Sequence, residues 1–190
     1  EYLQRHFTVL PLEEALERLH GGTLPDRAAV VTFDDGTQNL ITRAAPVLRD
    51  VDVPASVFLA TGPMGTEEAL WPDQLWLAFA RTQVAEVDLT ALGLGSRQLR
   101  NADDRGEAYQ LTVHHLKGLP DDQRLAWLGS VLTALAQDSN SAPGPFRLLS
   151  WEEARALAEG SDVTLYPHTV THPILARCPD PKLEHEIAAS

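Results

Sequence analysis

Short apolar runs and helical spacings alternate along the first 65 residues. Continuous apolar runs predict strands at residues 28–33 and 53–60, because strands that are covered on both faces have little polar alternation. Apolar positions three or four residues apart predict helices at 11–20 and 38–49. Residues 2–10 predict a further short strand with its lead-in. This alternation indicates an α/β sheet or barrel with parallel strands.

The pattern changes after residue 65. Three amphipathic stretches, separated by breaks that contain glycine or proline, predict helices at 67–82, 104–117 and 121–137, with no convincing strand between them. Residues 139–145 are rich in Ser, Pro and Gly and read as a return linker. We therefore interpret residues 66–146 as a helical insertion.

The first pattern resumes after this linker. Ser150-Trp151-Glu152-Glu153 is a capping-box pattern and predicts a helix that runs to about residue 159. A strand is predicted at 162–166, and a last helix begins near Pro181. The predicted organisation thus has three parts: a first α/β part at residues 1–65, the helical insertion at residues 66–146, and the continuation of the α/β part at residues 147–190.

Composition narrows the range of partners. The 190 residues suit one domain with an insertion, and 44% hydrophobic with 22% charged residues is ordinary for a globular protein. A formal charge of −12 without any Lys/Arg-rich run argues against nucleic acid and anionic membrane surfaces as partners. A neutral or cationic polymer would meet less repulsion. The chain contains no signal peptide and no apolar run near the roughly 18–20 residues of a membrane span.

Two adjacent carboxylates, Asp34 and Asp35, stand at the end of the predicted strand 28–33. In parallel α/β folds, active sites lie at the carboxyl ends of strands. Gly36 permits a tight turn there, so both carboxylates can serve one metal centre. The alternative interpretation is a simple turn between strand and helix in which one aspartate caps the helix.

Two histidines, His168 and His172, follow the predicted strand 162–166. Pro167 and Pro173 flank them, which favours a loop or a single helical turn. One carboxylate and two imidazoles are a common ligand set for a divalent metal and leave a position open for water. The remaining carboxylate is then a candidate general base. Two polar residues on a surface loop are the alternative.

Together these segments bear a family resemblance. Thr32-Phe33-Asp34-Asp35-Gly36 followed by His168-Thr169-Val170-Thr171-His172-Pro173 resembles the polysaccharide deacetylases, the NodB-homology domain of carbohydrate esterase family four. The resemblance extends over residues 1–65 and 147–190 and only loosely over the insertion. It implies a deformed (β/α)-barrel of the polysaccharide deacetylase type, which we expect to be C-terminally incomplete in this chain.

The resemblance also implies an activity. It predicts a metal-dependent hydrolase that removes N- or O-linked acetyl groups from a polysaccharide or oligosaccharide. Asp34 corresponds to the general base, and Asp35, His168 and His172 correspond to the metal ligands. Zinc is the expected ion, with cobalt, nickel or manganese as alternatives. An orienting arginine and a general-acid histidine are expected beyond Ser190.

Two further expectations follow from the resemblance. It favours a bacterial protein located outside the cytoplasm or in the cell envelope. A different class of function remains open, namely a metal-binding or carbohydrate-binding module of the same fold without efficient turnover, because no general acid can be assigned within these residues. The sequence leaves the oligomeric state open.

Overall fold

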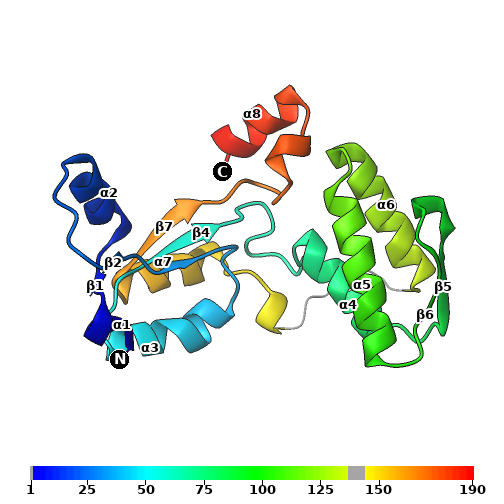
Figure 1. Ribbon diagram of the computed structural model, residues 1–190, viewed down its shortest axis with the longest axis horizontal. Helices are drawn as coiled ribbons and strands as arrows, with labels where there is room; N and C mark the ends of the chain where they lie inside the picture. The colour runs from blue at the N-terminus through cyan, green and yellow to red at the C-terminus, as the bar shows by residue number, and fades with distance from the viewer. Residues whose placement is uncertain (1, 137–143) are drawn as a thin grey trace.

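Parallel strand pairing organises the part of the chain outside the insertion (Figure 1). The computed structural model describes residues 2–136 and 144–190. Its three-stranded parallel sheet has the order β3-β4-β7, with bounds Thr32–Phe33, Ala55–Leu59 and Val163–Pro167. The central strand β4 is almost entirely buried. The mixed α/β class predicted from the sequence is confirmed.

A second small sheet pairs β1 (Thr8–Val9) with β2 (Ala28–Ala29), also in parallel. The single strand predicted at 28–33 is therefore wrong: its start belongs to β2 in one sheet and its end to β3 in another. An apolar run specifies burial, but it does not specify which neighbour each residue pairs with. The short strand predicted within residues 2–10 is β1, and its lead-in forms the short helix α1 (Tyr2–His6). The described strands make separate open sheets.

Helices flank these sheets close to the predicted positions. They are α2 (Leu12–His20), α3 (Ala45–Asp50), α7 (Trp151–Glu159) and α8 (Asp180–Ala188). The helix predicted at 38–49 is not uniform, because a π-helical turn at Leu40–Ala44 precedes α3. Pro46 lacks an amide donor and crowds the preceding turn, which disfavours a regular α-helix there.

The predicted capping box at the start of α7 is confirmed. The amide of Glu153 donates to the Ser150 hydroxyl at 3.1 Å, and the Glu153 carboxylate accepts from the Ser150 amide at 2.8 Å. Arg147 adds a hydrogen-bonded ion pair to the same carboxylate at 2.7 Å. These contacts stabilise the start of α7. The helix packs against β4, since Leu149, Leu157 and Val57 belong to the same buried cluster.

The insertion contains three helices, α4 (Trp71–Arg81), α5 (Ala102–Lys117) and α6 (Asp121–Ala134). Each lies where a helix is predicted. The last residue of the predicted helix 121–137 and residues 139–143 of the predicted linker lie outside the described part. The expectation of no strand is wrong, because β5 (Glu86–Leu89) and β6 (Gly95–Gln98) form an antiparallel hairpin.

The hairpin escapes prediction for a physical reason. Its first strand has four alternating residues, of which only Val87 and Leu89 are buried, and its second strand contains no large apolar residue. Such short patterns are not distinguishable from loop sequence. The connection depends on left-handed backbone at Gly93 and Gly95, with φ values of 73° and 68°.

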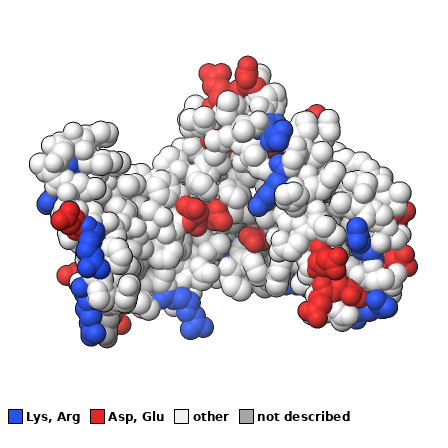
Figure 2. Space-filling view, in the orientation of Figure 1, with Lys and Arg blue, Asp and Glu red and all other residues white. Residues whose placement is uncertain are grey.

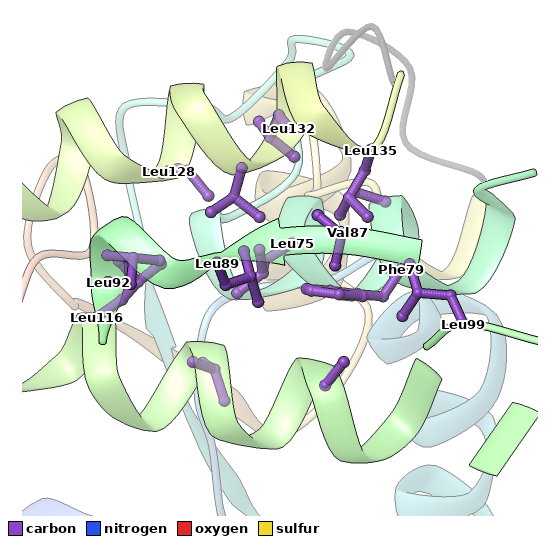
Figure 3. Packing of buried hydrophobic residues seen from close by; sticks show 14 of the residues in the cluster. Leu75, Phe79, Val87, Leu89, Leu92, Leu99, Leu116, Leu128, Leu132 and Leu135 are labelled. Atoms are coloured by element: carbon purple, nitrogen blue, oxygen red, sulfur yellow. The ribbon is translucent and has the colours of Figure 1, made fainter. Parts of the chain in front are cut away.

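A separate hydrophobic cluster holds the insertion together (Figure 3). Leu75 and Phe79 of α4 lie at its centre, between Leu128 of α6, Leu116 of α5 and Val87 of the hairpin. Each of the five is almost fully buried. The cluster includes no strand residue of the sheet β3-β4-β7, whose own cluster surrounds β4.

Charged side chains are distributed in small groups on the face shown in Figure 2, with basic groups lying among acidic ones. This arrangement offers no continuous basic surface on that face. Within residues 2–136 and 144–190, none of the helices has both the length and the apolar character that crossing a bilayer requires.

Substitution of Gly36 tests whether the turn after β3 requires glycine. Its φ is 83°, and a Cβ built there would lie 2.5 Å from Leu59 Cδ2. Gly36→Ala should lower the free energy of unfolding by about 2–4 kcal/mol, because left-handed strain and a steric clash add. Gly22→Ala is the matched control, since Gly22 has φ 66° with nothing within 4 Å of such a Cβ. Urea unfolding measures both, and equal losses would contradict the assigned clash.

Candidate metal centre

A strained turn places Asp35 at the carboxyl end of β3. The φ values of Asp35 and Gly36 are 72° and 83°, both in the left-handed region. Aspartate tolerates this region better than most residues, and such strain persists only where the surroundings hold it. Here the Asp35 carbonyl accepts from the Ala60 amide at 3.2 Å, and the Gly36 carbonyl accepts from the Leu149 amide at 2.8 Å. The turn is therefore held from two sides.

The histidine loop follows β7 and continues along the segment after β4. The His168 amide donates to the Leu59 carbonyl at 2.7 Å, and the Thr61 amide donates to the Thr169 carbonyl at 3.0 Å. Thr169 and His172 are both left-handed, with φ values of 68° and 55°. The Thr169 hydroxyl accepts from the His172 amide at 3.1 Å, which closes the loop. The predicted loop geometry of this motif is thus observed.

Asp35, His168 and His172 converge at one point. Asp35 Oδ1 lies 3.2 Å from His172 Nε2 and 3.8 Å from His168 Nε2, and one ligand atom of each residue lies within 4.8 Å of the others. Asp35 Oδ1 is buried and has no hydrogen-bond partner among the described residues. An orphaned carboxylate oxygen beside two imidazole nitrogens fits a divalent cation.

The protonation of His172 suits metal binding. Burial lowers the pKa of its imidazole below the usual value of 6.5, and the neighbouring His168 and Arg124 act in the same direction. The nearby carboxylates Asp35 and Asp34 oppose this effect without reversing it. Because neutral imidazole is the form that binds metals, the site is prepared for a cation near neutral pH.

Asp34 lies next to this ligand set. Its residue is exposed to solvent, and its charge acts on His172. An exposed carboxylate beside a metal centre can accept a proton from water. The structure thus brings together three of the four residues that the sequence singled out, and Asp34 is the chain neighbour of one of them.

Glu186 is a residue that sequence reasoning missed. It lies on α8, is 1% exposed, and accepts from the amides of Val170 and Thr171 at 2.9 and 2.7 Å. The Thr171 hydroxyl also donates to it. A buried carboxylate with three donors holds the histidine loop in place. In the sequence it is only one acid in a short amphipathic helix, and no signal marks it.

The insertion also contacts the histidine loop. Trp71, the first residue of α4, donates from Nε1 to the His172 carbonyl at 3.2 Å. The Arg124 guanidinium lies 4.6 Å from the centre of the Trp71 ring. Arg124 is paired with Asp121 at 2.5 Å, and Asp121 is paired with Lys182 of α8. Buried charges therefore connect α6 of the insertion with α8 beside the metal centre.

Asp73 brings a further carboxylate from the insertion. Burial, and then the charge of Asp35, raise its pKa from 3.8 to about 6. Sequence reasoning missed it because an acid in the first turn of a helix is explained by the helix dipole alone. A cation bound to Asp35 would favour the ionised form of Asp73.

Comparisons with known proteins agree with the motifs. A family model described as polysaccharide deacetylase matches residues 21–190. No curated protein matches the chain. Among solved structures, the deacetylase domain of BpsB from Bordetella bronchiseptica is similar, with 17% sequence identity and a TM-score of 0.42. That match covers 90% of this chain and 41% of the other, so this chain spans less than half the length of that relative.

Removing the Glu186 carboxylate tests the support of the histidine loop. Glu186→Ala leaves the amides of Val170 and Thr171 without their acceptor, and it should weaken zinc binding about 10- to 100-fold at pH 7. Isothermal titration with zinc measures the affinity. Glu184→Ala is the control, because Glu184 is an exposed acid on the same helix. Equal affinities of the two variants would show that Glu186 does not orient the ligands.

The pH dependence of zinc affinity tests Asp73. Above pH 6 its carboxylate is charged and attracts a cation, and below pH 6 it is neutral. Asp73→Asn should therefore weaken zinc binding about fivefold at pH 7.5, since a screened charge contributes about 1 kcal/mol. At pH 5 the variant should match the unmodified protein. Zinc titrations at the two pH values measure this, and Asp103→Asn, a change at an exposed acid, is the control. If Asp73→Asn weakened zinc binding equally at pH 7.5 and pH 5, the assignment would be refuted.

Proposed function

The chain belongs to the polysaccharide deacetylase family, and we propose that it is a metal-dependent hydrolase that removes N- or O-linked acetyl groups from a polysaccharide or oligosaccharide. The convergence of Asp35, His168 and His172 supports this proposal most directly. Two segments about 130 residues apart supply one carboxylate and two imidazoles at the carboxyl ends of β3 and β7, the two strands that flank β4. An additional carboxylate, Asp34, is the residue next to Asp35 in the chain.

Asp35, His168 and His172 would hold the ion. Zinc is the proposed metal, because one oxygen and two nitrogen ligands with an open position suit it, and cobalt, nickel or manganese are the alternatives. When bound, the ion supplies Lewis acidity to the acetyl carbonyl and to the attacking water. The lowered pKa of His172 keeps its imidazole available as a ligand.

Asp34 is the proposed general base. Its exposed carboxylate would take a proton from water as the water oxygen attacks the acetyl carbon. The bond from that carbon to the sugar nitrogen or oxygen then breaks, and the leaving group takes up a proton. Acetate and a free amine or hydroxyl are the products.

We also propose the wider architecture. The sheet β3-β4-β7 and the pair β1-β2 would belong to a deformed (β/α)-barrel, which is supported by the family match and by their parallel pairing. The separate hydrophobic cluster of the insertion supports the division into residues 1–65, 66–146 and 147–190. An acetylated carbohydrate is the proposed partner, and a location outside the cytoplasm or in the cell envelope rests on the family resemblance.

Acetate release from acetylated chito-oligosaccharides and acetylated xylan oligomers tests the activity. Asp34→Asn should retain zinc and lower kcat about 10²- to 10⁴-fold, because only the base is lost. His168→Ala should lose both zinc and activity, whereas His185→Ala, an exposed histidine, should lose neither.

Two other outcomes of these assays would contradict the proposed hydrolase. Acetate release that survives both a chelator and His168→Ala would refute the metal mechanism. Zinc binding by the unmodified chain without acetate release from any oligomer would instead support a binding module without turnover.

A further inference from the structure

A pocket of about 230 Å³ lies within the insertion, between α4 and α5. Trp76 and Phe79 of α4 face Tyr109 and Arg105 of α5 across it, and Gly106 forms part of its wall. Complete small-molecule sites are typically about 300–1,000 Å³, so this pocket suits one ring of a longer ligand. It combines aromatic surfaces with a cationic donor, which is the chemistry that recognises a ring with an apolar face and oxygen substituents.

Trp76 provides an accessible aromatic surface in this pocket. Its residue is 43% exposed, and its ring is held against Phe146 with 5.2 Å between the ring centres. A large exposed aromatic side chain that is already held by a neighbour loses little conformational freedom on binding.

Arg105 provides an unused hydrogen-bond donor. Its Nη1 donates to the Ala80 carbonyl at 3.1 Å, which fixes the guanidinium at the pocket wall. Its Nε is buried and has no partner among the described residues. A buried donor without an acceptor is unfavourable, so this guanidinium leaves hydrogen-bonding capacity in the wall of the pocket.

The pocket and the metal centre are joined by one helix. Trp71 at the start of α4 contacts the histidine loop, and Trp76 follows about 7.5 Å further along the helix axis. Asp73 lies between them in sequence, in the first turn of the same helix. The pocket is therefore lined by the helix that also contacts the histidine loop.

We propose that this pocket binds one sugar ring of the acetylated polysaccharide while another ring of the same chain lies at the metal centre. The identity of the ligand rests on the proposed function; the pocket itself does not. The site makes activity depend on chain length, because short oligomers fill only the metal centre.

Filling the pocket tests this proposal. Gly106→Leu adds a side chain at the pocket wall, where an added Cβ meets nothing within 4 Å, so the helix can accept it. Gly129→Leu is the matched control, since Gly129 is an exposed glycine inside α6 with equally open space. The probes are the N-acetylglucosamine hexamer and dimer.

Gly106→Leu and Trp76→Ala should each weaken hexamer binding and lower kcat/KM for the hexamer about five- to tenfold, while kcat/KM for the dimer and zinc affinity remain unchanged. Gly129→Leu should change none of these. Equal losses on hexamer and dimer, or hexamer binding that Gly106→Leu does not alter, would overturn the pocket assignment.

The pocket and the proposed function can fail separately. If the unmodified chain binds the hexamer but releases no acetate, and Gly106→Leu weakens that binding, the sugar site stands without the hydrolase. If acetate is released from both oligomers and no variant of the pocket changes the ratio of kcat/KM for the hexamer to kcat/KM for the dimer, the hydrolase stands and the sugar site is refuted.

Discussion

The position of β4 between β3 and β7 is the constraint on which the rest of the structure depends. Parallel pairing on both sides aligns the ends of three strands, so the turn after β3 and the loop after β7 reach the same edge of the sheet. The backbone of Leu59 and Ala60 then bonds both segments, through His168 and Asp35. A carboxylate and two imidazoles that are 130 residues apart in sequence thereby come within 4.8 Å. Neither segment could form the ligand set alone.

Strain and burial are concentrated at this edge. Asp35, Thr169 and His172 have left-handed backbone, which costs free energy at each position and requires compensation by the surroundings. Two buried groups supply it from outside the sheet: Glu186 accepts the loop amides from α8, and Trp71 donates to the His172 carbonyl from the insertion. The site is thus shaped by elements that carry no metal ligand, which is how surrounding shells commonly orient ligands.

The insertion is more than a spacer within the chain. Its own hydrophobic cluster packs around α4, and α4 contacts the histidine loop at one end and lines the aromatic pocket further along. Asp73 adds negative charge between these places, in a chain that already carries a formal charge of −12. A cation at the centre is favoured by this charge, and a polymer without negative charge meets no strong repulsion.

The sequence by itself determined most of the helices, the mixed α/β class and the residues Asp35, His168 and His172 that come together, because residue spacing and ligand chemistry are local properties. It did not determine the split of residues 28–33 between two sheets or the β5-β6 hairpin, because pairing partners lie far apart in the chain and four-residue strands carry little pattern. Only the tertiary structure decided the roles of Glu186, Trp71 and Asp73, since each acts through a neighbour from another element. Their residue types alone fit equally well on an ordinary helix surface, and burial beside the metal centre is what distinguishes them.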